Sequence, residues 1–187
     1  MNIEKIIKRI DVYRVMKVIA LNEISNNQNF IYKFSYAGGR SGYSFGRSQF
    51  DVKNNDSAKK FLQKKCNFSD SDINRLLQLD KDILDLNGKL LEHKKEIDEL
   101  DLQHIKSMIN HVVRLEGLPE MNEKAFIHLV DYHNQFNLAI NGKMHKYLKT
   151  LKIATSENIL NFKLKTKWGI EHPTDVIRRY NNIEKNY

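Results

Sequence analysis

The 187-residue sequence predicts an α+β fold that is mainly helical. Apolar residues recur at helical spacing along most of the chain, and a hydrophobic fraction of 41% indicates a folded globule. Residues 29–51 differ, because aromatic and β-branched residues replace helix formers and four glycines appear. We expect a single domain over residues 1–187, with an N-terminal helix and hairpin in 1–54 and a helical part in 55–187.

The first helix is predicted over residues 3–22, and Glu23 falls at its C-terminal end. Carbonyl groups at this end of a helix repel negative charge and so favour a protonated carboxyl group. A carboxylic acid serves as a general acid near neutral pH only where its surroundings favour that form. Glu23 is therefore a catalytic candidate. The apolar positions that predict the helix are Ile3, Ile6, Ile7, Ile10, Tyr13, Val18 and Leu21.

A β-hairpin is predicted over residues 29–51, with its turn at residues 37–42. Asp51, at the far end of the hairpin, is the first acidic residue after Glu23. A glycosidase often uses a second carboxylate beside its acid, so we expect Asp51 to lie across a cleft from Glu23. The alternative is a turn or helix-capping carboxylate, since the residues after Asp51 are themselves typical of a turn.

The rest of the chain is predicted to be helical, and capping residues mark several of the helix starts. Asn55 or Asp56 begins a helix that runs through Leu62, and Ser69 with Asp72 begins the helix expected over residues 73–79. Further helices are expected within 80–115 before Gly117 and Pro119, and over 123–136 (capped by Asn122), 143–150, 156–164 and 173–184.

The formal net charge of +8 indicates an anionic partner: nucleic acid, anionic lipid or an acidic polymer of a bacterial envelope. Cys66 is the only cysteine, which excludes an internal disulfide, and we expect it to be a small buried apolar residue. Charged residues interrupt the first helix, so we expect neither a signal peptide nor a membrane span. We expect the protein to be synthesised in the cytoplasm. The histidine spacings do not match a metal site, and no cofactor is predicted.

A second polar cluster occupies residues 131–136, where Tyr132, Asn134 and Gln135 offer hydrogen-bonding groups suited to sugar hydroxyls and N-acetyl groups. We expect these side chains to face Glu23 from the far wall of a cleft. An ordinary helix C-terminus is the alternative.

Two segments of the sequence belong together: Glu23-Ile24-Ser25 and Gly42-Tyr43-Ser44-Phe45-Gly46-Arg47-Ser48-Gln49. They resemble the active-site core of the lysozyme-like superfamily, which includes phage endolysins, goose-type lysozymes, lytic transglycosylases and family-46 chitosanases. Gly39-Arg40-Ser41-Gly42-Tyr43-Ser44-Phe45-Gly46 is also similar to a chitosanase element, with one extra residue between arginine and glycine. The resemblance covers residues 10–55.

The resemblance implies a lysozyme-like fold in which Glu23 is the proton donor, Tyr43, Ser44 and Gln49 line the cleft, and Asp51 positions water. Phage lysozymes place an aspartate within the first hairpin, whereas this chain has no acidic residue between Glu23 and Asp51. Transglycosylase chemistry, in which one glutamate acts first as acid and then as base, therefore stays open.

The function implied is cleavage of the β-1,4 bond between N-acetylmuramic acid and N-acetylglucosamine in peptidoglycan, after release through a membrane pore or an export machine. Lytic transglycosylase and chitosanase-like activities are alternatives within the superfamily. A non-catalytic basic helical protein that binds nucleic acid is the alternative from another class, but the lysine and arginine pairs are scattered and no nucleic-acid-binding motif accompanies them. A catalytically inactive structural relative of lysozymes is a third.

Overall fold

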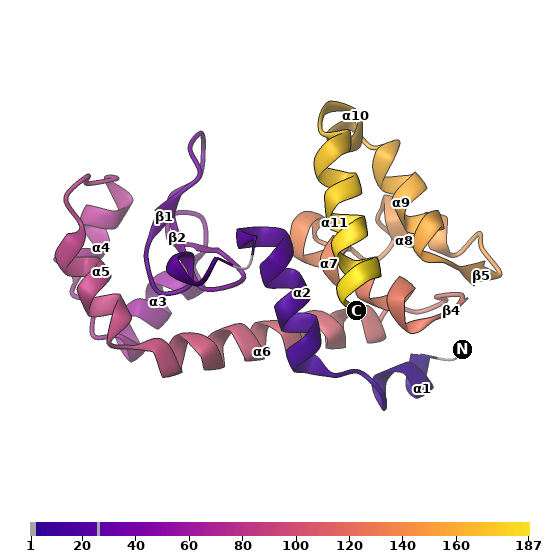
Figure 1. The fold of residues 1–187 in the computed structure, drawn as a ribbon, viewed down its shortest axis with the longest axis horizontal. Helices are drawn as coiled ribbons and strands as arrows, with labels where there is room; N and C mark the ends of the chain where they lie inside the picture. Colours follow the sequence, from indigo (N-terminus) through magenta and orange to yellow (C-terminus); the bar gives the residue numbers. More distant parts are fainter. Residues whose placement is uncertain (1–2, 26) are drawn as a thin grey trace. The chain divides into compact units, whose positions relative to one another are not determined.

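The computed structural model describes residues 3–25 and 27–187, which are mainly helical with a small antiparallel sheet (Figure 1). The predicted class, α+β and mainly α, is confirmed. The chain groups into two compact units: one joins the residues up to Asn22 with His104–Tyr187, and the other is Glu23–Gln103. We call them unit 1 and unit 2. Their boundaries differ from the division at residue 54 that the sequence suggested.

The predicted N-terminal helix is two helices, α1 (Ile3–Ile7) and α2 (Val12–Ile24). Asp11 separates them, because its carboxylate accepts hydrogen bonds from the N–H groups of Tyr13 and Arg14, at 2.9 and 3.2 Å. Such a side chain satisfies the free N–H groups of a helix start. The apolar spacing runs on across this break and did not reveal it.

Unit 2 contains a three-stranded antiparallel sheet where the sequence predicted a two-stranded hairpin. Strand β1 (Ser35–Tyr36) pairs with β2 (Tyr43–Phe45), which pairs with β3 (Phe50–Asp51). The predicted turn at 37–42 joins β1 to β2, and a second turn joins β2 to β3. Residues before β1 form the short 3-10 helix η1 (Gln28–Phe30).

The helices of unit 2 follow their caps. Asn55 accepts from the N–H groups of Ser57 and Ala58 at the start of α3 (Asp56–Lys65). Ser69 and Asp72 form the predicted capping box of α4 (Asp70–Leu77). The segment 80–115 contains two helices, α5 (Leu84–Leu91) and α6 (Lys94–Val113).

An aromatic core holds the sheet of unit 2 together. Phe45 is fully buried, and its ring centroid lies 5.9 Å from that of Phe34, 5.7 Å from Phe50 and 6.0 Å from Phe61. Strands this short need such packing to persist. Cys66 is also buried, as predicted, and burial followed by the charge of Glu96 raises the pKa of its thiol to about 12.

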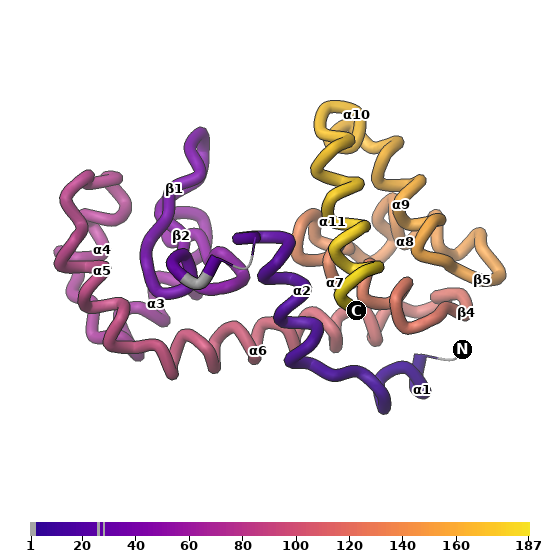
Figure 2. Tube along the Cα trace, viewed as in Figure 1, coloured from indigo at the N-terminus to yellow at the C-terminus, as the bar shows by residue number. Residues whose placement is uncertain are grey.

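Unit 1 is built on α7 (Glu123–Phe136), which Asn122 caps as the sequence predicted. Figure 2 follows the chain from α9 (Ser156–Leu164) through α10 (Lys167–Glu171) into α11 (Pro173–Asn186), and α7, α9 and α11 pack on one another. The sequence missed α10 and a two-stranded parallel pairing of β4 (Glu120–Met121) with β5 (Ile153–Ala154). Helix α8 (Lys143–Leu148) completes the unit.

Asp131 on α7 is a fully buried carboxylate at the centre of unit 1. It accepts from Arg179 Nη2 at 2.6 Å, from Asn22 Nδ2 at 2.9 Å and from Lys163 Nζ at 3.3 Å. Burial alone would raise the pKa of Asp131, but the charges of Arg179 and Lys163 outweigh it and hold that pKa well below the ordinary range. The carboxylate therefore stays ionised and ties α2, α9 and α11 to α7.

We expect Asp131→Asn to lower the free energy of unfolding by about 3–5 kcal/mol at neutral pH, because it leaves two buried cations without their carboxylate. Since the native pKa of Asp131 is depressed, its stabilisation is present above the ordinary carboxyl pKa and is lost as pH falls below it. The difference in the free energy of unfolding between parent and variant should therefore become smaller below roughly pH 4. Urea titrations at several pH values measure it.

Glu116→Gln is the control, because Glu116 is an exposed acidic residue of the same unit. A gap that is constant from pH 7 to pH 3, or a variant as stable as the parent, contradicts the role given to Asp131.

Candidate active site

Glu23 occupies the last turn of α2, where it is half-buried between the buried side chains of Asn22 and Ile24. The helix ends because Ser25 adopts a left-handed backbone conformation, with φ 52°. The N–H of Asn27 then bonds back to the carbonyl of Ile24 at 2.9 Å. The helix-end position that the sequence predicted for Glu23 is therefore correct to within one residue.

A pocket of about 520 Å³ opens beside Glu23, and all of its lining belongs to unit 2. This volume lies within the usual range for small-molecule sites. Glu23 supplies the one carboxyl group of the lining, and Ser35 and Gln49 supply a hydroxyl and an amide. Other lining residues are Ile24, Ser25, Asn27, Phe30, Tyr36 and Ala37.

Gln49 is held in place by two hydrogen bonds. Its Oε1 accepts from Ser35 Oγ at 2.7 Å, and its Nε2 donates to the carbonyl of Gly46 at 3.0 Å. The backbone of Gln49 is left-handed, with φ 52°, in the turn between β2 and β3. A side chain fixed in this way is preorganised for a ligand.

The turn that carries Gln49 is anchored to α6. Asp101 accepts from the N–H of Arg47 at 2.8 Å and from the N–H of Ser48 at 3.0 Å. Burial raises the pKa of Asp101, although these two N–H groups favour its ionised form. Gly46 has φ 77°, and a Cβ there would lie 3.0 Å from the ring of Phe50. The glycine of the Gly-Arg-Ser-Gln run thus has a structural reason, and the next two residues hold the turn through their backbone N–H groups.

Asp51 serves the structure of the hairpin. Its carboxylate accepts from the N–H groups of Gly42, Lys53 and Asn54, and from the side chain of Asn54 at 2.8 Å. Burial raises the pKa of Asp51, but these hydrogen bonds outweigh it, and the pKa lies below its ordinary value. Asp51 is not among the residues that line the pocket of Glu23. The contacts of Asp51 therefore agree with the alternative of a turn carboxylate.

Two other predicted cleft residues are placed outside the pocket lining. Ser44 is 8% exposed within β2, and the hydroxyl of Tyr43 donates to the carbonyl of Asp80 at 2.8 Å. The sequence analysis missed Ser35 and Tyr36. In the sheet, Ser35 pairs with Ser44 and Tyr36 pairs with Tyr43 on the neighbouring strand. Side chains alternate between the two faces of a strand, so this pairing with the motif was the signal that could have identified Ser35 and Tyr36.

Tyr132, Asn134 and Gln135 lie on α7 in unit 1, whereas Glu23 belongs to unit 2. Within unit 1 the ring of Tyr132 packs on that of Phe136, with centroids 5.2 Å apart, and burial raises the pKa of its hydroxyl. The amide oxygen of Asn134 accepts from Nε2 of His104 at 3.2 Å. A shared cleft with Glu23 stays a prediction.

Among the described residues, no group of three or more histidine, cysteine, aspartate and glutamate side chains could hold a metal ion. No helix in the described parts of the chain has the length and apolarity to cross a bilayer. Comparison of the chain with protein-family models, curated proteins and solved structures found no match.

We expect Asp51→Asn to lower the thermal midpoint of unfolding. Any cleavage of peptidoglycan by the folded variant should stay close to that of the parent. The substitution weakens the acceptor of the turn but changes no lining residue of the Glu23 pocket. Circular dichroism measures the midpoint, and activity is normalised to the folded fraction. A variant with the parental midpoint and no activity would return Asp51 to the mechanism.

Proposed function

We propose that this chain cleaves the glycan strands of peptidoglycan, with Glu23 as the general acid. The observation that carries the proposal is the pocket in unit 2 that brings Glu23 together with the hydrogen-bonded pair Ser35 and Gln49. A carboxyl group beside fixed hydroxyl and amide groups suits an amino-sugar polymer, whose ring substituents are hydroxyls and amides. The resemblance of the motif to the lysozyme-like superfamily supports the same conclusion.

The chemistry begins with transfer of the Glu23 proton to the oxygen that links two sugars. The bond between that oxygen and the anomeric carbon then breaks, and the oxygen leaves as a hydroxyl while positive charge develops on the sugar ring. The carboxylate of Glu23 next removes a proton from the nucleophile, whose oxygen bonds to the anomeric carbon. If the nucleophile is water, the product is a hydrolysed glycan. If it is the sugar's own primary hydroxyl, the product is an anhydro-sugar.

The described lining contains one carboxyl group, so the pocket by itself supplies chemistry with one residue acting as acid and then base. This favours a transglycosylase-like reaction over an inverting hydrolysis that depends on Asp51. Phe30 and Tyr36, which are 43% and 46% exposed, add apolar surface for the faces of sugar rings. The basic net charge favours encounter with an anionic wall.

Glu23→Gln should reduce cleavage of purified peptidoglycan by about 10²–10⁴-fold, because it removes the transferable proton and keeps the shape of the side chain. The assay is loss of turbidity, with mass analysis of the released fragments to distinguish reducing ends from anhydro-sugars. Glu92→Gln is the matched control, since Glu92 is an exposed glutamate of the same unit outside the pocket. Near-parental activity in Glu23→Gln, or equal losses in both variants, contradicts the proposal.

A further inference from the structure

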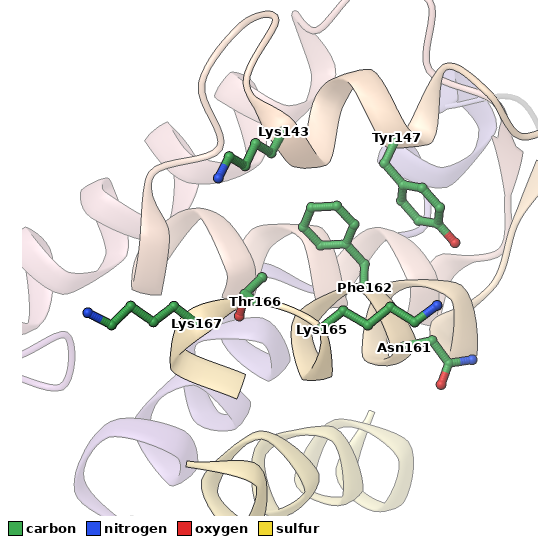
Figure 3. A pocket seen from close by; sticks show the side chains of 7 residues that line it. All are labelled: Lys143, Tyr147, Asn161, Phe162, Lys165, Thr166 and Lys167. Atoms are coloured by element: carbon green, nitrogen blue, oxygen red, sulfur yellow. The ribbon is translucent and has the colours of Figure 1, made fainter. Parts of the chain in front are cut away.

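A second pocket, of about 450 Å³, lies in unit 1 between α8, α9 and the start of α10 (Figure 3). It shares no residue with the pocket of Glu23. We call it the lysine pocket, because Lys143, Lys165 and Lys167 line it. Nothing in the proposed glycan cleavage uses these residues.

The floor of the lysine pocket is aromatic. The rings of Tyr147 and Phe162 stack on each other, with centroids 5.0 Å apart and planes inclined by 28°. Figure 3 shows the Phe162 ring in the middle, with Lys143 and Lys167 at one end and Lys165 and Asn161 at the other. The pocket therefore has an apolar centre and cationic groups at both ends.

Most of the positive charge of this pocket has no acidic partner among the described residues. No carboxylate is among the lining residues, and Lys143 and Lys165 form no ion pair with any described residue. Lys167 reaches Glu171 only at 3.9 Å, and its side chain is 90% exposed. Two cations without an ion-pair partner, Lys143 and Lys165, and a third that is only weakly paired surround one concave site and attract an anionic ligand.

The side chains that line the pocket favour a short acidic peptide over a nucleic acid. Single-stranded nucleic acids stack their bases on free aromatic faces, whereas Tyr147 and Phe162 each cover one face of the other ring. The pocket also lacks an arginine, the residue best suited to grip phosphate with two hydrogen bonds. A peptide with separated carboxylates and small apolar side chains matches cations at both ends and an aromatic centre. Asn161 and the hydroxyl of Tyr147 offer hydrogen bonds to its amides.

We infer that the lysine pocket binds a short peptide bearing two or more carboxylates and small apolar side chains. Its identification with the peptide arm of the wall polymer rests on the proposed function. Binding there would let the chain recognise the peptide of the polymer apart from the glycan strand that Glu23 attacks.

The test uses the full chain and the synthetic probe N-acetyl-L-Ala-γ-D-Glu-meso-diaminopimelate-D-Ala, with binding measured by calorimetry. The double variant Lys143→Gln/Lys165→Gln should weaken binding about ten-fold or more, because two charge-assisted contacts are lost. The matched control is Lys152→Gln/Lys185→Gln, which removes two exposed lysines of the same unit outside the pocket. It should change the affinity less than two-fold. Amidation of the probe's carboxylates should abolish binding.

Equal affinities of the two double variants, or equal binding of the amidated probe, overturn the inference. Tighter binding of a single-stranded oligothymidylate that also depends on Lys143 and Lys165 would overturn it in favour of nucleic acid. The two proposals fail separately. If the probe binds the lysine pocket but the parent cuts no glycan, only the catalytic proposal fails; if glycan is cut and the probe does not bind, only the peptide site fails.

Discussion

The buried carboxylate of Asp131 is the interaction on which the packing of unit 1 depends. An isolated ion in an apolar interior is strongly unfavourable, and Asp131 is tolerated because Arg179, Lys163 and Asn22 all donate to it. Through these partners one side chain of α7 fixes α9, α11 and the end of α2. Asn22 is held at its backbone as well, since its carbonyl accepts from Arg178 at 3.0 Å. The residue that precedes Glu23 in the helix is thus held through both its side chain and its backbone.

Unit 2 applies the same principle to a turn. Asp101 is fully buried, and it holds the N–H groups of the turn that presents Gln49. Ser35 then fixes the amide of Gln49 from the neighbouring strand. Asp131 therefore holds the residue next to Glu23, and Asp101 holds the two residues that precede Gln49. A site assembled on constrained turns and helix ends keeps its geometry without help from a ligand.

Local signals in the sequence predicted the parts of the fold that local physics determines. The caps at Asn55, Ser69 and Asn122 placed three helix starts correctly, because a cap is a contact between near neighbours in the chain. The sequence could not reveal the pairing of Asp131 with Arg179, which are 48 residues apart, or the parallel strands β4 and β5. Such contacts depend on how the chain folds back on itself. The helix-end position of Glu23 is local and was predicted; the partnership of Ser35 and Gln49 needed the register of the sheet.

The central claim is that Glu23 protonates a glycosidic oxygen in the pocket of unit 2. A crystal structure of the Glu23→Gln protein with a peptidoglycan tetrasaccharide tests it most directly. The account predicts a glycosidic oxygen roughly 2.6–3.2 Å from the side chain at position 23, with Ser35 or Gln49 bonded to a substituent of an adjoining sugar. A tetrasaccharide bound away from this pocket, or one whose glycosidic oxygens all lie beyond reach of position 23, would contradict it.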